Sequence, residues 1–391
     1  MSAKVCIIQY NASKYLTRVD RAARALAGAG FDVVLIALKD EDTPLFEDRG
    51  AYTVKRLELT SRRLPRGYGL KFVRFAEGIW RTFVAAWRED ADVYNPRDAY
   101  PLLVAHLAAT LRRAQVVYDS DELAIGRNWK VAENRFWLAS MKAYEGFFAR
   151  RSAAVITSDF GRADALERTY AIPRPTVVLN VPEVIADPQA DLEFRQQALG
   201  DRRYLLLYQG VFNRNRGLPE AIEAMRALDD CRLALVGYGP MEAELKQLAR
   251  TAALEDAVAF FDAVPFDTLM RYTAAADVGL IPIVGACLSY ATAAPNKLFE
   301  YMMVGLPVVA SDLPDMARVV RETGAGTLIE DPTDPSSIAS AVRTLLDNPD
   351  GLSVVGGRGR EAALSRYNWG VEAPKLIETF AAVVADREGA A

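Results

Sequence analysis

Two patterns of apolar residues alternate along the chain. Runs of about four to eight apolar residues are typical of buried strands, and apolar residues at every third or fourth position are typical of helices that cover a sheet. In the first half, strands are predicted in KVCIIQY, FDVVLIAL, DVYN, QVVYD and AAVITS. RAARALAGAG and FGRADALERTY have the helical pattern. We therefore expect parallel strands, joined by helices, in a doubly wound sheet.

The same alternation starts again after residue 200. Strands are predicted in RYLLLYQG, CRLALVGYG, AVAFFD, DVGLIPI, LPVVAS and GTLIE. Residues 178–193 are rich in Pro and Asp and form the predicted linker. We expect an α/β protein with two Rossmann-like domains, at residues 1–180 and 181–365. A last amphipathic helix in residues 366–391 is expected to pack back toward the first domain.

Two charged loops follow predicted strands of the second series. In YQGVFNRNRGLPEAIEAM the strand ends at Gly210, and Arg214 and Arg216 follow in a polar loop before Gly217 opens the next helix. Open α/β sheets bind ligands beyond the carboxyl ends of their strands. This loop is therefore a candidate for ligand binding.

The second loop leads into the helix of APNKLFEYMMVGLPVVAS. Pro295 suits the first turn of a helix, and Gly305 ends it. Lys297 and Glu300 are three residues apart and share a face of the first turn, beside unpaired backbone N–H groups and the positive end of the helix dipole. Such a helix start can seat a phosphate.

Arg216 and Lys297 can together hold a diphosphate without a metal, each charge-assisted hydrogen bond contributing about 1.5 to 3 kcal/mol. Glu300 cannot favour phosphate and is expected to accept hydrogen bonds from hydroxyls, as on a ribose. The alternative is an exposed Lys297–Glu300 ion pair, with Arg214 and Arg216 serving only as solvent-exposed residues of a polar loop. Both loops occupy equivalent positions in one domain, which favours a binding site over this alternative.

Composition excludes several classes of protein. The 391 residues are 51% hydrophobic and 25% charged, enough for two buried cores. A net charge of −4 without a basic tail argues against nucleic-acid binding. The three cysteines are far apart, which fits neither a disulfide framework nor a metal site and favours a reducing compartment. Without a signal-like segment or an apolar run of about 18 residues, we expect a cytoplasmic protein that does not span the membrane.

His106 is the only histidine, in the apolar segment PLLVAHLAATL. This setting favours a histidine of the core over a catalytic base. Nucleophile schemes that pair a histidine with Ser or Cys are disfavoured, and no metal site is expected.

Four segments resemble successive landmarks of a known family: QGVFNRNRG, LVGYGPMEAEL, AADVGLIPI and PNKLFEYMMVGLPVVAS. The family is the retaining, nucleotide-sugar-dependent glycosyltransferases of the GT-B fold (glycosyl transferases group 1, family 4-like), which includes mannosyl- and N-acetylglucosaminyltransferases. The resemblance covers most of residues 203–332 and is looser before residue 180. It implies two Rossmann-like domains facing a cleft, the first binding the acceptor and the second the nucleotide sugar.

The resemblance also implies roles for single residues. A basic loop residue and a lysine at a helix start bind the diphosphate in that family, which implies this role for Arg216 and Lys297. A glutamate at the place of Glu300 binds the ribose, and backbone near Val264 and Pro265 meets the base, for which uridine is implied. The transfer implied is front-face and retaining, with the departing diphosphate taking the acceptor's proton and the two cations stabilising the leaving group.

The chain departs from the family pattern in the second domain. Many members carry a Glu eight residues before Glu300, where this chain has Thr292, and a basic residue after the first loop glycine, where it has Val211. We expect the donor sugar to be contacted by the segment that precedes Lys297, through Ser289, Tyr290, Thr292 and Asn296.

In the first half, VVYDSDEL resembles a family segment in which a histidine follows the aspartate by two residues. Asp121 stands in that place. It is either a catalytic contact to the donor sugar or acceptor, or a solvated loop acid beside Asp119 and Glu122. The family's usual glycine pair after the first strand is replaced by QYNAS, residues 9–13.

Residues 54–88 hold nine Lys or Arg against two Glu. Arg74, Arg81 and Arg88 recur every seven residues beside a stripe of apolar and aromatic residues, as on an amphipathic helix. Such a helix suits an anionic membrane surface and a lipid-linked acceptor, each cation near the surface adding about 1 kcal/mol. A helix that packs on the core and exposes a basic edge has the same pattern.

Proteins of other classes fit less well. An NAD oxidoreductase needs glycines directly after a strand, but GAGFD precedes a strand and VGYGP lacks the third glycine. A sugar-nucleotide epimerase, or a non-catalytic protein that binds nucleotide sugars, would share the fold. No cofactor other than the nucleotide sugar is expected.

Overall fold

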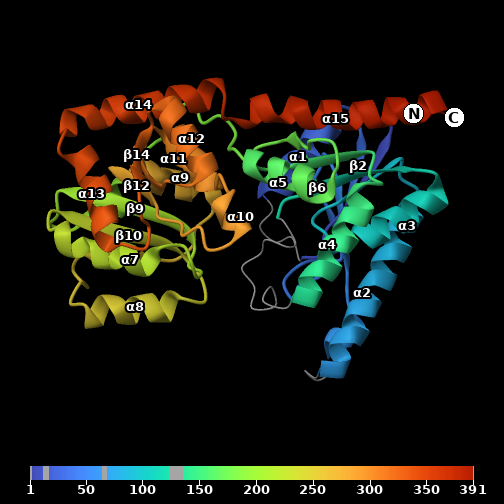
Figure 1. Ribbon diagram of the computed structural model, residues 1–391, viewed down its shortest axis with the longest axis horizontal. Coiled ribbons are helices and arrows are strands. Elements are labelled where there is room, and N and C mark those ends of the chain that lie inside the picture. Colours follow the sequence, from blue (N-terminus) through green and yellow to red (C-terminus); the bar gives the residue numbers. More distant parts are fainter. Residues whose placement is uncertain (1, 12–16, 64–67, 123–134, 391) are drawn as a thin grey trace. The chain divides into compact units, whose positions relative to one another are not determined.

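The computed structural model describes residues 2–11, 17–63, 68–122 and 135–390. The chain forms two compact units (Figure 1). The first comprises Met1–Leu179 together with Glu372–Ala391, and the second comprises Asn180–Val371. The chain therefore leaves the first unit once and returns to it.

The first unit is built on a sheet of eight strands in the order β3-β4-β2-β1-β5-β6-β7-β8. All neighbouring strands are parallel except β3 and β4, which are antiparallel. The strands are β1 (Lys4–Ile8), β2 (Asp32–Leu38), β3 (Phe46–Asp48), β4 (Thr53–Leu57), β5 (Val93–Pro96), β6 (Gln115–Ser120), β7 (Ala154–Thr157) and β8 (Thr176–Val177).

Helices cover this sheet, and α2 extends beyond the other elements of the unit (Figure 1). They are α1 (Thr17–Gly28), the 3-10 helix η1 (Thr60–Arg63), α2 (Tyr68–Glu89), α3 (Leu102–Arg112), α4 (Arg135–Ala149), α5 (Phe160–Tyr170) and α15 (Trp369–Ala390).

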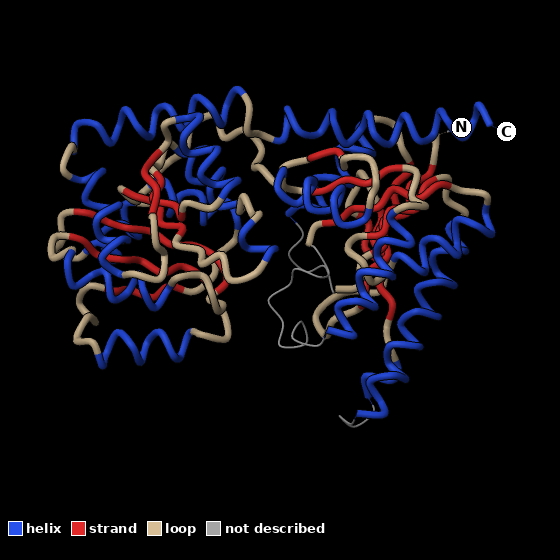
Figure 2. The backbone as a smooth tube through the Cα atoms, in the orientation of Figure 1, coloured by secondary structure: helices blue, strands red, loops and turns tan. Residues whose placement is uncertain are grey.

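The second unit has a parallel sheet of six strands in the order β11-β10-β9-β12-β13-β14 (Figure 2). Its strands are β9 (Tyr204–Val211), β10 (Cys231–Tyr238), β11 (Val258–Phe261), β12 (Val278–Ile281), β13 (Val308–Ser311) and β14 (Gly326–Ile329). The chain runs from β9 outward to β11 and then resumes at β12 on the other side of β9. The prediction of two doubly wound parallel sheets is confirmed.

One helix precedes the first strand of the second unit, and one or more helices follow each of its strands. They are α6 (Leu192–Leu199), α7 (Leu218–Ala224), the 3-10 helix η4 (Met225–Ala227), α8 (Glu242–Thr251), α9 (Phe266–Ala274), α10 (Leu288–Ala291), α11 (Asn296–Val304), α12 (Pro314–Thr323), α13 (Pro335–Leu346) and α14 (Pro349–Ser365).

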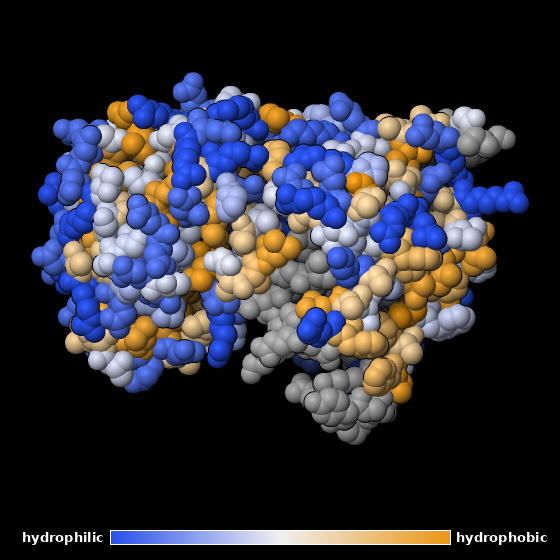
Figure 3. All heavy atoms as spheres, viewed as in Figure 1, coloured by the Kyte–Doolittle hydropathy of each residue, from blue (hydrophilic) through white to orange (hydrophobic). Residues whose placement is uncertain are grey.

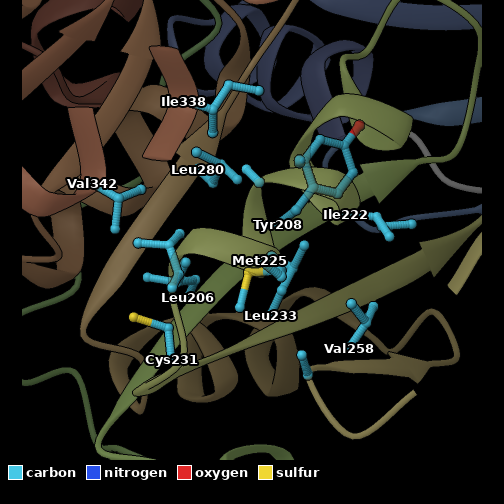
Figure 4. Packing of buried hydrophobic residues seen from close by; sticks show 14 of the residues in the cluster. Leu206, Tyr208, Ile222, Met225, Cys231, Leu233, Val258, Leu280, Ile338 and Val342 are labelled. Carbon is cyan, nitrogen blue, oxygen red and sulfur yellow. The ribbon is translucent and has the colours of Figure 1, made fainter. Parts of the chain in front are cut away.

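The strand sequences reflect burial on both faces of the sheet. In β9 every residue from Tyr204 to Gln209 is buried, because helices cover both faces of a parallel sheet. Leu206 and Tyr208 point to one face, where they join a large apolar cluster with residues of β10 and α13 (Figure 4). This is why residues 204–208 read as an uninterrupted apolar run.

Within the described part of the chain, no helix has the length and apolar character needed to cross a bilayer.

Candidate functional site

The two charged loops leave the second sheet where its strand order reverses. β9 leads into residues 212–217, which carry Arg216, and β12 leads into residues 282–295, which precede Lys297. Ligands of doubly wound sheets bind at such a point, at the carboxyl ends of the strands. The fold therefore brings both predicted basic residues to one edge of one sheet.

The backbone of the first loop is fixed against the second. Asn215 and Gly217 both have left-handed conformations, with φ of 61° and 66°. A Cβ on Gly217 would lie 1.8 Å from the carbonyl oxygen of Pro282, so only glycine fits there. The Val284 N–H also donates to the carbonyl oxygen of Asn215 at 3.0 Å. Arg216 is thus held between two residues of fixed conformation.

Lys297 lies in the first turn of α11, and its side chain is only 9% exposed. Its ammonium lies 3.5 Å from the centre of the Tyr208 ring. Among the described residues, no carboxylate forms an ion pair with it. Burial lowers the pKa of Lys297 well below its usual value, and the positive charge of Arg216 lowers it further, while Glu300 opposes the shift. An anion bound here would raise the pKa of Lys297 again and favour its charged form.

Arg216 has a similar environment. Its guanidinium lies 4.5 Å from the centre of the Tyr290 ring, and the described part of the chain gives it no carboxylate partner. The start of α11 also has no side-chain cap. Two cations and uncapped backbone amides therefore converge, and no described carboxylate forms an ion pair with either cation, as a site for a bound anion requires.

The structure rules out an exposed Lys297–Glu300 ion pair. The Glu300 carboxylate instead accepts a hydrogen bond from the side-chain amide of Gln209 at 2.6 Å. The Gln209 amide oxygen accepts one from the Thr273 hydroxyl at 2.7 Å. Gln209 is 2% exposed, so this contact fixes Glu300 from inside the domain. The sequence signal for Gln209 is a polar residue within an apolar strand.

Tyr301 hydrogen-bonds to the backbone of β9 where β9 and β12 begin to diverge. β9 and β12 are paired only at Val278 with Leu206 and Gly279 with Leu207. Beyond these pairs the buried Tyr301 hydroxyl donates to the Leu207 carbonyl and accepts from the Gln209 N–H, both at 3.2 Å. Sequence analysis missed this residue because its role depends on a contact 94 positions away.

The residues expected to contact the donor sugar lie between the end of β12 and the first residue of α11. Ser289 and Tyr290 belong to the short helix α10, and the Thr292 hydroxyl donates to the Leu288 carbonyl at 2.9 Å, at the end of that helix. Asn296 is the first residue of α11, and Pro295 precedes the helix instead of lying in its first turn as predicted.

Val264 and Pro265 lie at the same edge of the sheet, after β11 and before α9. Because β10 separates β11 from β9, the strand that precedes them lies two strands, or about 10 Å, from β9.

Asp121 belongs to the first unit and follows β6. Its carboxylate oxygens lie 3.4 Å from Arg18 and 3.2 Å from Arg97, and Arg162 donates to its backbone carbonyl. Burial tends to raise the pKa of Asp121, but the three arginines outweigh it and lower the pKa to about 2. With a side chain 36% exposed, Asp121 is an anchored carboxylate and not a solvated loop acid.

The arginines around Asp121 were not anticipated from the sequence. Arg18, Arg97 and Arg162 are each more than nine-tenths buried, and Asp119 and Asp159 balance their charge with Asp121. Each arginine is far from the others in sequence, so composition carries no sign of the cluster. Of QYNAS, Ala12 and Ser13 lie outside the described residues.

Among the described residues, no group of three or more His, Cys, Asp or Glu side chains is arranged to hold a metal ion.

Two family models match the chain, one in each half. The model described as "Glycosyl transferase 4-like domain" matches residues 15–182. The model described as "Glycosyl transferases group 1" matches residues 203–348. Together they cover most of the chain.

Curated relatives are named glycosyltransferases. A GDP-mannose-dependent alpha-(1-6)-phosphatidylinositol monomannoside mannosyltransferase of Mycolicibacterium smegmatis is 30% identical over 59% of this chain and 60% of its own length. Amylovoran biosynthesis glycosyltransferase AmsK of Erwinia amylovora is 29% identical over 61% of this chain and 57% of its own length. The chain thus spans less than two thirds of the length of these relatives.

Solved structures share the fold over nearly the whole chain. Sucrose-phosphate synthase from Thermosynechococcus elongatus superposes with a TM-score of 0.82 at 20% identity, covering 98% of this chain and 100% of that one. Anabaena HepE, solved in complex with UDP, gives a TM-score of 0.72 at 16% identity and covers 97% of this chain and 100% of that one. Both similarities concern the GT-B fold.

Proposed function

Because the chain belongs to the glycosyl transferases group 1 family, we propose that it transfers a sugar from a nucleoside-diphosphate sugar to an acceptor. The observation that carries this proposal is the pair of cations, Arg216 and Lys297, at one edge of the second sheet, neither of which forms an ion pair with a carboxylate of the described residues. A diphosphate supplies the missing negative charge. The uncapped amides of α11 add hydrogen-bond donors directed at the same anion.

The nucleoside is proposed to extend along the sheet edge from the diphosphate. Glu300, fixed by Gln209, accepts hydrogen bonds from the ribose hydroxyls. The base reaches the backbone near Val264 and Pro265, about 10 Å from β9. Uridine is the proposed base, with guanosine the main alternative because the mycobacterial relative is named as GDP-mannose-dependent.

The donor sugar is proposed to contact the segment between β12 and α11. Ser289, Tyr290 and Asn296 place polar groups there, and Thr292 stands where many family members have a glutamate. The Thr292 hydroxyl is engaged by the Leu288 carbonyl, so it can only accept a further hydrogen bond from a sugar hydroxyl.

Transfer is proposed to be front-face, with retention of configuration. Asp121, whose pKa is about 2, is too weak a base to accept the acceptor's proton near neutral pH. We propose that an oxygen of the departing diphosphate takes this proton, and that Asp121 accepts a hydrogen bond from a sugar or acceptor hydroxyl. Arg216 and Lys297 then stabilise the charge that develops on the leaving group, so we expect activity to survive EDTA.

A thermal-shift panel with UDP-, GDP-, ADP- and TDP-sugars tests the donor site. A ligand at 100 times its Kd adds about 2.7 kcal/mol of stability, so the true donor should stand out. The K297A variant should lose this shift and at least about tenfold in kcat. Unchanged kcat and KM in this variant would refute the role of Lys297.

Incubation of labelled donor without acceptor separates the alternative functions. An epimerase alters the sugar under these conditions, a non-catalytic binding protein leaves it unchanged with every acceptor tried, and a transferase needs an acceptor.

We further propose that the acceptor is lipid-linked and that α2 contacts an anionic membrane. Apolar side chains of α2 and α3 are exposed, and this part of the surface is hydrophobic (Figure 3). Phe72 and Trp80 are 79% and 64% exposed. Part of the basic edge is engaged within the protein, because Arg74 donates to the Ser61 carbonyl and Arg81 pairs with Glu77. Residues 64–67 of the basic segment lie outside the described residues.

Flotation with vesicles tests this contact. The protein should float with phosphatidylglycerol vesicles and remain below with phosphatidylcholine vesicles, and W80E should weaken the binding. Failure to float with anionic vesicles would argue against the membrane proposal but would leave the donor site untouched.

A further inference from the structure

Both cations of the candidate donor site lie over the faces of aromatic rings. The Lys297 ammonium lies 3.5 Å from the centre of the Tyr208 ring, and the Arg216 guanidinium lies 4.5 Å from that of Tyr290. Both distances are well within the range of a cation–π interaction, which extends to about 6 Å. The ring of Tyr208 is the more constrained of the two because the residue is fully buried.

Tyr208 is fixed independently of Lys297. Its ring belongs to the apolar cluster beneath the sheet (Figure 4), and its hydroxyl donates to the Val211 carbonyl at 3.1 Å. Burial raises the pKa of its phenol, so the ring stays neutral at physiological pH. The ammonium also lies beside Gly210, since a Cβ there would be in contact with the Lys297 Nζ at 3.4 Å.

An aromatic face suits an anion site better than a carboxylate does. A carboxylate would neutralise the ammonium and compete with the phosphate. The face of a ring attracts the cation but accepts none of its three conventional hydrogen bonds, which remain available for an incoming oxyanion. The ring also offsets part of the cost of holding a charge in a buried position.

We propose that Tyr208 is a positioning residue of the donor site, whose ring holds the Lys297 ammonium charged and directed toward the bound diphosphate. This inference rests on the proposed function in one respect, that the ligand carries a diphosphate. The role is distinct from simple core packing because it depends on the electron density of the ring and not only on its volume.

The test uses the full-length chain, with inorganic pyrophosphate as the probe. Isothermal titration across pH 6 to 10 is compared for the wild type, Y208F and Y208L. Y208F keeps the ring and should bind within about twofold of the wild type. Y208L loses the ring and should bind about tenfold more weakly. The pH at which its affinity falls should be about one unit lower than in the wild type, because the Lys297 ammonium is less stabilised.

A series of fluorinated variants and one control variant separate charge from packing. Replacement of Tyr208 by phenylalanines with one, two or three ring fluorines keeps the shape and weakens the π-face stepwise, so the logarithm of the affinity should fall with each fluorine. F260L is the matched control, because Phe260 lies 5.6 Å from the Lys246 ammonium outside the site. It should leave pyrophosphate binding unchanged.

A readout without ligand keeps this inference separate from the proposed function. The rate at which acetic anhydride labels Lys297, followed by mass spectrometry against pH, reports the pKa of that ammonium. If no pyrophosphate or nucleotide binds to the wild type, the proposed function fails, while the labelling still measures the effect of Tyr208. Equal labelling profiles and equal affinities throughout the fluorine series would overturn the role of Tyr208.

Discussion

The ammonium of Lys297 is nine-tenths buried and has an aromatic ring in place of a carboxylate. Such a charge costs stability that a bound anion would recover. We predict that K297M, which keeps the length of the side chain, raises the free energy of unfolding by about 1 kcal/mol while weakening nucleotide binding at least tenfold. Urea denaturation of the ligand-free protein checks the stability. A clear loss of stability would mean that Lys297 is structural.

His106 gives a prediction about pH. It is half-buried, its Nε2 lies 3.3 Å from the Ser152 hydroxyl, and the centre of its ring lies 5.0 Å from that of the tilted Phe148 ring. Burial lowers the pKa of His106 to about 4, and the charge of Arg151 contributes. As the pH falls, His106 binds a proton in the unfolded chain before it does so in the folded protein. The stabilising contribution of His106 is therefore complete above about pH 6.5 and is lost as the pH falls toward 4.

The comparison of H106Q with the wild type isolates this effect. After allowance for partial exposure, the wild type should lose about 1 kcal/mol more stability than H106Q between pH 7 and pH 4. Parallel stability profiles for the two proteins would contradict a low pKa for His106.

Sequence patterns pointed to the charged residues of the candidate site but not to the residues that support them. Arg216 and Lys297 stand out because they follow strands and begin helices, which is local information. Tyr208 and Tyr301 read as ordinary core residues of an apolar strand and helix, and Gln209 differs from its neighbours only as a polar residue within an apolar strand. Their contacts join segments about 90 positions apart, and only the folded sheet brings these together.

At the scale of elements, the loop after β9 depends on one glycine. Gly217 has φ of 66°, and a Cβ on it would lie 1.8 Å from the Pro282 carbonyl oxygen. We predict that G217A destabilises the second unit by about 2 kcal/mol or more and displaces Arg216, weakening nucleotide binding. Thermal unfolding and nucleotide titration measure the two effects.

G28A is the matched control for this loop. Gly28 is the last residue of α1 and has no φ in the left-handed region, and a Cβ added to it would meet no atom within 4 Å. The substitution should change stability by less than about 1 kcal/mol. If both variants were equally stable, the close approach to Pro282 would not be what requires glycine at position 217.

The central strands were predictable because their apolar runs are continuous. The edge strand β3 was not, since FED spans three residues and has one apolar side chain. The helix α4 also escaped prediction, because few of its side chains are buried although apolar residues lie on several of its sides. Edge strands and partly covered helices lack a strong periodic signal.

At the scale of the whole molecule, the last helix completes the first unit. The Leu179 N–H donates to the Glu372 carboxylate at 2.9 Å, and Arg387 pairs with Asp92. Phe380 is fully buried and lies edge-on to Phe31, with ring centres 6.4 Å apart. The first unit therefore needs residues from both ends of the described chain.

We predict that residues 180–371 unfold cooperatively as an isolated fragment. Residues 1–179 alone should be less stable than the same unit in the full chain by about 3 kcal/mol or more, because the site of Phe380 is left empty. Addition of a peptide of residues 372–391 should restore stability in proportion to its concentration. A fragment 1–179 as stable as the intact unit would refute this dependence.

The return of the chain to its first unit reverses the usual order of events during translation. A ribosome that has made residue 371 has already supplied everything the second unit needs, whereas the first unit still lacks the helix that fills its core. Domains generally fold in the order of their synthesis. Here the earlier half of the polypeptide cannot complete its core until the last helix is made. Its nascent form is therefore the one that most needs protection by a chaperone.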